Sequence, residues 1–351
     1  MKILYLYAEV LGYTMATIQA LVNDGAEVHV VHWDHKKLTA YQHPAMDGVH
    51  FYRRSEMTVE AICTLARNLS PNITVVSGWM DKGYLSVARI LRKNNLPVAM
   101  GLDGQWLPSL RQFVASLAGR MGYFSRYFSH AWVAGVYQYE YARKLGFDKN
   151  SIVYDLYSAD IMLFNQAYAS TKEHKKIAYP HRFLFVGRLE PIKGLDVLMA
   201  AWALLSEVRA DWDFHLVGDG SLKPMLASVP GIVLKPFMQP DLLIQEVKQA
   251  GCFVLPSRGE PWGVVVHEFA AAGMPLIVSN VVGAASTFLI NGFNGFTFLV
   301  NDNESLAKKM LAIIESSDAE LLLMAQRSHQ LGQKITPDTS AGNLLAIGIN
   351  L

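Results

Sequence analysis

The chain contains little cysteine and no excess charge of either sign. Two cysteines, Cys63 and Cys252, occur among 351 residues, both in apolar surroundings. This excludes a disulfide framework and favours buried thiols in a reducing compartment. The sequence has 31 Lys and Arg against 30 Asp and Glu, so it lacks the basic excess typical of proteins that bind nucleic acid. We expect no nucleic-acid partner, and any anionic ligand must be bound by local charges.

A long apolar run is also missing. No stretch approaches the ~20 apolar residues that a membrane-spanning helix requires. The strand-like start at residues 3–7 is followed at once by Glu9 and Gly12, unlike a secretory signal. We therefore expect a cytoplasmic protein, with the inner face of the membrane as the place of any peripheral contact.

What the chain does have is a regular alternation of short apolar runs and longer helical patterns. Such alternation is typical of repeated βα units that form a parallel sheet. One series of strand-like runs ends near residue 133, and a second series begins at residues 183–187 after a polar stretch, residues 170–176, that resembles a linker or surface turn. Because the length also exceeds that of a typical single domain, we predict two Rossmann-like domains. They comprise residues 1–168 and residues 169–336, and a further helical pattern follows at residues 337–351.

The most informative stretch is residues 259–273, which carries two glutamates. Glu260 precedes and Glu268 lies within an apolar helical run that follows the strand-like residues 252–255. In a parallel α/β sheet this edge is where ligands bind. Gly263 permits close backbone approach at the start of the helix, where phosphate is favoured, and Glu268 is placed to accept hydrogen bonds from a ribose.

This run resembles the paired-glutamate motif of the GT-B glycosyltransferases, specifically glycosyltransferase family 4. The resemblance implies the GT-B fold, in which two Rossmann-like domains face each other and a C-terminal helix, here residues 337–351, returns to the N-terminal domain. It further implies retaining transfer of a sugar from a nucleotide-diphosphate sugar, with no metal and no cofactor. Glu260 then faces the donor sugar as a catalytic residue, Glu268 holds the ribose, and Trp262, Gly263 and Val264 contact the substrate.

A second motif places two cations in one loop. Arg188 and Lys193 lie between a buried strand and a helix, in the order Gly-Arg-Leu followed by Lys-Gly. A guanidinium and an ammonium there can stabilise a departing diphosphate without a metal. The same pattern occurs in the family, so we assign both residues to catalysis.

Three further positions are candidate substrate contacts. The turn of Gly218, Asp219 and Gly220 ends the next strand and is either an ordinary strand-to-helix turn or part of the donor site. Gly12 stands where family members often carry two glycines, and Asp103 stands roughly where many carry a histidine. Asp103 is a weak base at neutral pH, so it either orients sugar hydroxyls or is a turn residue.

Residues 107–130 alternate apolar and basic side chains at helical spacing. A core helix is one interpretation. The other is a basic amphipathic surface that contacts anionic lipid or holds a lipid-linked acceptor. No metal site is predicted, because the run Asp211-Trp212-Asp213, which looks like the metal motif of a different glycosyltransferase fold, precedes a strand at the edge opposite the cleft.

Together these features predict a glycosyltransferase of cell-envelope polysaccharide synthesis, whose partners are a nucleotide-sugar donor and a glycan or lipid-linked acceptor. The alternatives are a non-catalytic nucleotide-sugar-binding subunit of a glycan assembly complex and a GT-B epimerase or phosphorylase.

Overall fold

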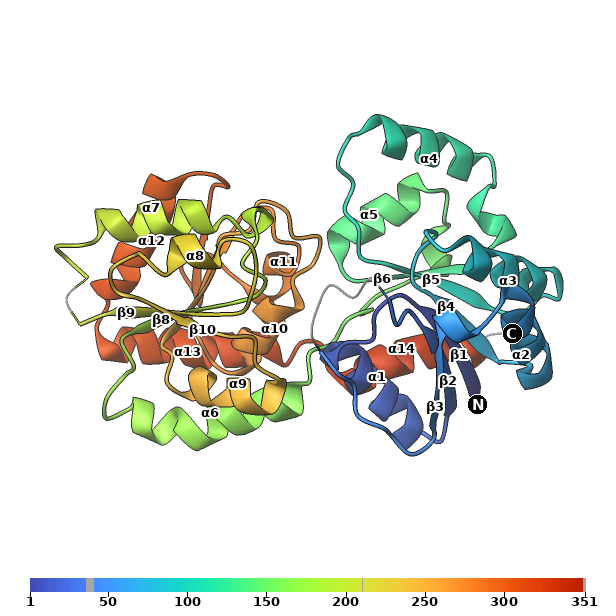
Figure 1. Cartoon of the computed structure of the whole chain (residues 1–351), viewed down its shortest axis with the longest axis horizontal. Coiled ribbons are helices and arrows are strands. Elements are labelled where there is room, and N and C mark those ends of the chain that lie inside the picture. Colours follow the sequence, from blue (N-terminus) through green and yellow to red (C-terminus); the bar gives the residue numbers. More distant parts are fainter. Residues whose placement is uncertain (36–40, 210, 350–351) are drawn as a thin grey trace. The chain divides into compact units, whose positions relative to one another are not determined.

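The computed structural model describes residues 1–35, 41–209 and 211–349, which form two compact units (Figure 1). Unit 1 comprises Met1–Ser158 and Ile335–Leu351, and unit 2 comprises Ala159–Lys334. The division therefore lies earlier than the one expected between residues 168 and 169, and the chain returns to unit 1 at residue 335 rather than 337.

Unit 1 is built on a parallel sheet with the strand order β3-β2-β1-β4-β5-β6-β7. The strands are β1 (Lys2–Tyr7), β2 (Glu27–His32), β3 (Val49–Arg53), β4 (Ile73–Val76), β5 (Val98–Leu102), β6 (His130–Val133) and β7 (Ile152–Val153). The helices are α1 (Gly12–Asn23), α2 (Val59–Leu69), α3 (Lys82–Lys93), α4 (Leu110–Arg120), α5 (Val136–Lys144) and α14 (Pro337–Ile349). Figure 1 shows the returning helix α14 beside α1, so the expectation that the C-terminal helix packs on the N-terminal domain is confirmed within unit 1.

The inner strands of unit 1 were predictable and its edges were not. Five residues of β1 and five of β2 are buried, because a parallel sheet is covered by helices on both faces. The edge strand β3 has no buried residue, and β7 has two residues. Neither edge strand carries the continuous apolar run that identified the inner strands, which is why sequence reasoning missed both.

Unit 2 repeats the design with the strand order β10-β9-β8-β11-β12-β13. Its strands are β8 (Arg182–Val186), β9 (Asp213–Val217), β10 (Ile232–Lys235), β11 (Cys252–Leu255), β12 (Leu276–Ser279) and β13 (Gly295–Phe298). Its helices are α6 (Ile161–Lys175), α7 (Leu195–Leu204), α8 (Lys223–Leu226), α9 (Pro240–Lys248), α10 (Val264–Ala271), α11 (Ala285–Phe288), α12 (Asn303–Ile314) and α13 (Asp318–Gly332). The neighbouring strands named here pair in parallel in both sheets.

The prediction of a linker at residues 170–176 is wrong, since α6 continues to Lys175. Lys175 is buried, donates from Nζ to the carbonyl of Ala250 at 3.3 Å and lies over the Tyr179 ring. Burial lowers its pKa to about 8. The helix packs against α9 and α10 of its own unit. The prediction rested on polar composition alone, and it was wrong because tertiary contacts stabilise the helix.

The strand order reverses at one point in each sheet. The chain leaves β1 toward β2 and β3 and then returns to its other side with β4, and it leaves β8 toward β9 and β10 and returns with β11. At such a switch point the loops at the carboxyl ends diverge and leave room for a ligand. In unit 2 the loops after β8 and β11 flank this point, and they contain the predicted catalytic residues.

Candidate functional site

The centre of the candidate site in unit 2 is an ion pair between a lysine and a glutamate. Lys193 belongs to the short 3-10 helix η4 (Pro191–Lys193) after β8, and Glu260 lies in the loop after β11. Lys193 Nζ donates to Glu260 Oε2, and Ser257 Oγ donates to the same oxygen at 3.2 Å. The side chains are only 14% and 16% exposed. The sequence predicted a role for each residue but not that they contact each other.

Arg188 is the second cation of this loop, and its surroundings differ from those of Lys193. It is exposed, and within the described residues its guanidinium has no recorded hydrogen bond. Nearby Glu190 accepts from the backbone N–H and the hydroxyl of Ser221 at 3.0 and 2.6 Å. These bonds, the hydroxyl's above all, lower the pKa of Glu190. Arg188 is therefore available to an anionic ligand, whereas Lys193 would share its ammonium with Glu260.

Arg258 joins the loop of Lys193 to the loop of Glu260, a role that the sequence analysis missed. Its guanidinium donates to both carboxylate oxygens of Asp196 at 2.7 and 2.6 Å and to the carbonyl of Pro191 at 2.9 Å. Its backbone N–H donates to the carbonyl of Ile192 at 2.8 Å. This clamp fixes η4, and with it Lys193, against the loop that carries Glu260. The sequence offered one indication of this role, because Arg258 lies two residues before Glu260 in the same loop.

The glycine turn after β9 packs against the loop of Arg188. A Cβ on Gly218 would lie 1.9 Å from the carbonyl oxygen of Gly187, and one on Gly220 would lie 2.4 Å from that of Leu189. Asp219 accepts from Lys223 Nζ at 2.6 Å and from the backbone N–H of Phe237 at 3.2 Å. The turn therefore has a structural reason for its glycines, and its assignment to substrate binding stays a prediction.

The start of α10 has the backbone conformation that was expected for close ligand approach. Gly263, its N-cap, has φ 90°, and a Cβ there would lie 2.9 Å from Cγ of Glu260. Val264 is the first residue of the helix and is half-buried. Trp262 is 3% exposed and its ring packs edge-on to Phe288, so its indole belongs to the core of unit 2. Among these three residues, a ligand at this helix terminus would meet Gly263 and Val264.

Glu268 is half-buried in α10. Burial, reinforced by the negative charge of Asp160, raises its pKa to about 7. At a pH near this pKa, the carboxyl group can either accept a hydrogen bond from a ribose hydroxyl or donate one to it.

His267, which lies between the two glutamates in the sequence, was also missed by sequence reasoning. Its Nδ1 accepts from the backbone N–H of Ala159 at 3.1 Å, and its Nε2 donates to the carbonyl of Gly332 at 2.9 Å.

Glu268→Gln is expected to gain stability relative to the unchanged protein as pH rises. A carboxyl group whose pKa is raised by folding contributes its full stabilisation at pH values below its ordinary pKa of 4.5. This stabilisation is lost as pH rises through the folded-state pKa of about 7. The difference between the proteins should reach at most roughly 3 kcal/mol near pH 8. Urea unfolding across this range measures it, with the exposed Glu304→Gln as matched control. A difference that stays constant with pH would contradict the raised pKa.

In unit 1 the predicted positions Gly12 and Asp103 lie at the carboxyl edge of the sheet. Gly12 begins α1, and Asp103 follows β5. Tyr157 Oη donates to Asp103 Oδ2 at 3.3 Å, and Gln138 Nε2 donates to its carbonyl at 2.9 Å. Burial, with the charge of Asp103, raises the pKa of Tyr157, whose ring lies edge-on to Tyr13 with centroids 4.8 Å apart. Asp103 thus sits in a tyrosine-lined polar setting, and its two predicted roles both remain predictions.

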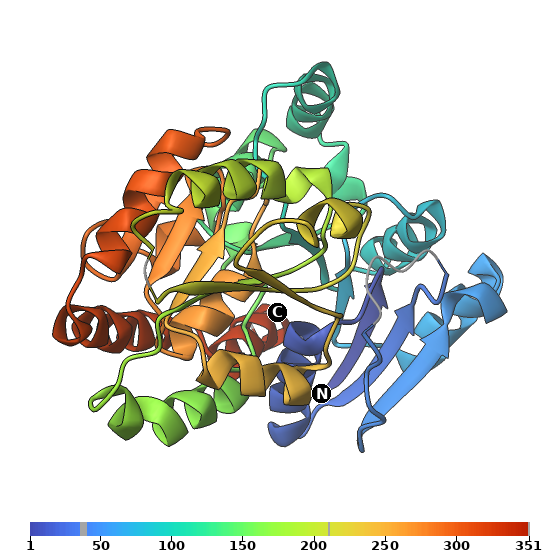
Figure 2. The same ribbon diagram turned by 60° about the vertical axis from the view of Figure 1, so that its left-hand side comes forward.

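Helix α4 does not bury its large apolar residues, so a core helix is the wrong interpretation of residues 110–120, whereas Phe124 and Phe128 further along the predicted stretch are buried in the core. It contacts its own unit through small residues. Ser116 Oγ donates to the carbonyl of Lys144 at 2.8 Å, and a Cβ on Gly119 would lie 2.2 Å from the carbonyl of Leu145. In both Figure 1 and Figure 2, α4 stands away from the sheet of unit 1. Seven large apolar residues on and beside it are at least 41% exposed, namely Leu107, Leu110, Phe113, Val114, Leu117, Met121 and Tyr123; we call them the α4 surface.

The two aspartates of the run that looks like a metal motif have protein partners. Asp213 accepts two hydrogen bonds from the guanidinium of Arg182, both at 2.7 Å. Asp211 pairs with His181. The run precedes and begins β9, at the amino edge of the sheet.

Comparison with known proteins gives a family match in unit 2. Residues 180–316 match the family model described as Glycosyl transferases group 1. An uncharacterized glycosyltransferase of Methanocaldococcus jannaschii is 29% identical over 183 residues, which are 48% of this chain and 48% of that protein. A D-inositol 3-phosphate glycosyltransferase of Streptomyces avermitilis is 31% identical over 141 residues, 36% of this chain and 30% of that protein. The chain thus matches about half or less of the length of these relatives.

Solved structures match the whole chain. Anabaena HepE in complex with UDP has a TM-score of 0.74 at 16% identity, and each chain is covered to 100%. The sucrose-phosphate synthase of Thermosynechococcus elongatus has a TM-score of 0.73 at 17% identity, covering 100% of this chain and 97% of that one. At such low identity the likeness concerns the fold, and it confirms two Rossmann-like domains of the GT-B type. No helix in the described part of the chain is long and apolar enough to cross a membrane.

Proposed function

We propose that this protein, whose residues 180–316 match the model of the Glycosyl transferases group 1, belongs to that family and transfers a sugar with retention from a nucleotide-diphosphate sugar to a glycan or lipid-linked acceptor. The observation that carries the proposal is the Lys193–Glu260 pair, held beside the exposed Arg188 at the carboxyl edge of the unit 2 sheet. A diphosphate seated against both cations would bring the donor sugar toward Glu260. Glu268 and the start of α10 would receive the nucleoside end.

The chemistry needs no metal in this proposal. As the bond between the sugar C1 and the diphosphate oxygen breaks, the negative charge that develops on the oxygen is stabilised by Arg188 and Lys193. The acceptor oxygen forms the new bond to C1 from the same face, and its proton passes to the departing phosphate oxygen. This path requires no enzymic base, and it is compatible with Asp103 standing where the family often has a histidine.

A uridine nucleotide is the first donor to test, because HepE of the same fold was solved with UDP and with UDP-glucose. A thermal-shift screen with UDP, GDP, ADP and their common sugars, in EDTA, should show a rise in melting temperature with one nucleotide class, since a ligand that binds the folded state stabilises it. Acceptor-dependent release of the nucleoside diphosphate should follow. Binding without turnover would indicate a non-catalytic subunit, and donor conversion without that release an epimerase.

We further propose that the α4 surface docks on anionic lipid at the inner face of the membrane, which would bring the protein to a lipid-linked acceptor. Its exposed side chains are large and apolar, and a contiguous exposed surface of such side chains is unusual on a folded protein. No Asp or Glu occurs between Asp103 and Glu140, while Arg111, Arg120 and Arg126 lie in that interval and are exposed. Apolar insertion together with positive charge is the combination that binds a peripheral protein to acidic headgroups.

The triple variant Leu110→Ser, Phe113→Ser and Leu117→Ser is expected to lose at least tenfold in affinity for phosphatidylglycerol vesicles. The three side chains are 56–81% exposed, so their replacement should leave the fold intact. Co-sedimentation with phosphatidylglycerol and with phosphatidylcholine vesicles measures the effect. The matched control is Leu242→Ser, an equally exposed leucine on α9. Equal binding of variant and control, or no preference for the anionic vesicles, would contradict membrane docking.

A further inference from the structure

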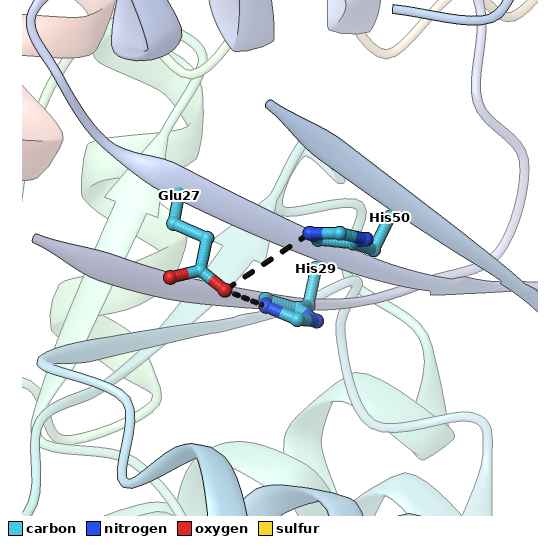
Figure 3. A group of neighbouring side chains, drawn as sticks. All are labelled: Glu27, His29 and His50. Carbon is cyan, nitrogen blue, oxygen red and sulfur yellow. Dashed lines mark hydrogen bonds and ion pairs between the residues drawn. The ribbon is translucent and has the colours of Figure 1, made fainter. Parts of the chain in front are cut away.

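Three potential metal ligands lie together on one face of the unit 1 sheet, at its outer side. Glu27 and His29 are two residues apart on β2, so their side chains point to the same face. His50 is the register partner of His29 on the edge strand β3, which brings it to that face as well. Figure 3 shows the three side chains converging. Sequence reasoning missed this group, because β3 was not predicted.

The donor atoms of the three residues are close enough to share one ion. His29 Nε2 lies 2.8 Å and His50 Nε2 lies 4.0 Å from Glu27 Oε1, and one ligand atom from each residue can be chosen such that all lie within 4.8 Å of one another. The imidazole rings of His29 and His50 stack with centroids 4.6 Å apart. Both Nε2 atoms therefore approach the same carboxylate oxygen, as the ligands of one shared ion would.

A partner outside the group orients His29. Its side chain is only 9% exposed, and its Nδ1 lies 3.0 Å from Tyr52 Oη. A hydroxyl group both donates and accepts, so Tyr52 can accept from Nδ1–H when Nε2 gives its lone pair to a metal. Metal-bound histidines are usually fixed by such a hydrogen bond on the other ring nitrogen. Tyr52 thus lets His29 adopt the tautomer that a metal requires.

Charge and exposure also fit a bound cation. The carboxylate of Glu27 brings a negative charge to the group. The side chains of Glu27 and His50 are 44% and 55% exposed, which leaves room for water to complete the coordination. Lys2, the register partner of Glu27 on β1, carries a positive charge that opposes a cation, and its side chain is free to move because the residue is exposed.

We propose that Glu27, His29 and His50 form a binding site for a first-row divalent cation of the Zn²⁺ class. Two imidazole nitrogens and one carboxylate oxygen are a ligand set that suits Zn²⁺, Co²⁺ and Ni²⁺. It does not suit Mg²⁺ and Ca²⁺, which prefer oxygen ligands. The bound ion would join the edge strand β3 to β2. It lies near the amino ends of these strands, opposite the carboxyl edge of the sheet, so its role is structural rather than catalytic.

The test uses full-length protein that has been stripped with EDTA and dialysed. Titration with ZnCl₂ in a calorimeter is expected to show one ion per chain, and Co²⁺ should give the visible absorption of a tetrahedral site with nitrogen and oxygen ligands. His50→Ala and Glu27→Gln should each weaken Zn²⁺ binding at least tenfold and remove the Zn²⁺-dependent rise in melting temperature. The matched control is His174→Ala, an exposed histidine on α6, which should bind as the unchanged protein does.

Two outcomes would overturn the site. One is Zn²⁺ binding that His50→Ala leaves unchanged, and the other is no binding at all to the unchanged protein. Because His50 is exposed, its replacement should not unfold the chain, and circular dichroism checks this. Sugar transfer is measured in parallel, with Zn²⁺ and with EDTA. Transfer is expected to be the same in both, so that failure of the metal site and failure of the proposed glycosyltransferase function remain distinguishable.

Discussion

Glu260→Gln is expected to lower the rate of sugar transfer by about 10²–10⁴-fold while nucleotide affinity changes little. Glutamine keeps the volume of the side chain but removes the charge that faces the donor sugar in the proposed complex. It also releases Lys193 from its ion pair, so the ammonium remains available to the diphosphate. The measurements are single-turnover rates with the donor that the thermal-shift screen selects and the dissociation constant of its nucleoside diphosphate.

Arg188→Ala should behave differently, because it removes a cation from the diphosphate site. Loss of a charge-assisted hydrogen bond costs about 1.5–3 kcal/mol, so nucleotide affinity and transfer should both fall by roughly tenfold or more. Lys308→Ala, an exposed lysine on α12, is the matched control for charge, and Glu304→Gln is the control for Glu260. Equal losses of nucleotide affinity in the Glu260 and Arg188 variants would refute the division of roles.

Gly218→Ala is expected to destabilise the protein by about 3–5 kcal/mol, because two costs combine at this position. The backbone of Gly218 has φ 151°, and the new Cβ would lie 1.9 Å from the carbonyl oxygen of Gly187. That oxygen belongs to the backbone of the Arg188 loop, so it cannot rotate away as a flexible side chain would. Urea unfolding of the two proteins measures the difference, and weakened nucleotide binding should accompany it.

Gly292→Ala separates the two costs. Gly292 also has a positive φ, 78°, but nothing lies within 4 Å of its added Cβ. This variant pays only for the left-handed backbone, about 1–2 kcal/mol. If Gly218→Ala proved no more destabilising than Gly292→Ala, the close packing of the glycine turn on the Arg188 loop would be refuted.

The candidate site shows how far local patterns reach. The sequence predicted that Arg188, Lys193 and Glu260 follow buried strands, and in a parallel sheet all carboxyl ends meet at one edge. It could not predict which side chains pair there. The Lys193–Glu260 contact joins residues 67 positions apart, and Arg258 reaches back to Asp196 across a similar interval. Both contacts depend on the placement of β8 beside β11.

The helix patterns show the same limit from another side. The spacing of apolar residues in α4 predicts a helix, but it is silent on which face the rest of the protein covers. Ser116 and Gly119 permit close backbone approach to the end of α5, so the small face is buried and the large apolar residues are left outside. In α6 the opposite occurs, since a polar segment is held as a helix by packing that reaches Lys175.

The sequence by itself determined the parallel α/β architecture, the inner strands, the returning C-terminal helix and the residues of the two motifs. The architecture, the inner strands and the motif residues follow from periodicity and from residue types at fixed spacing, which act within a few residues of chain. The return of the C-terminal helix follows from the resemblance to the family. Only the tertiary structure decided the ion pair at the site, the outward face of α4, the extent of α6 and the edge strand that brings His50 to His29. Those features arise between segments distant in sequence, where burial and register, rather than local propensity, select the conformation.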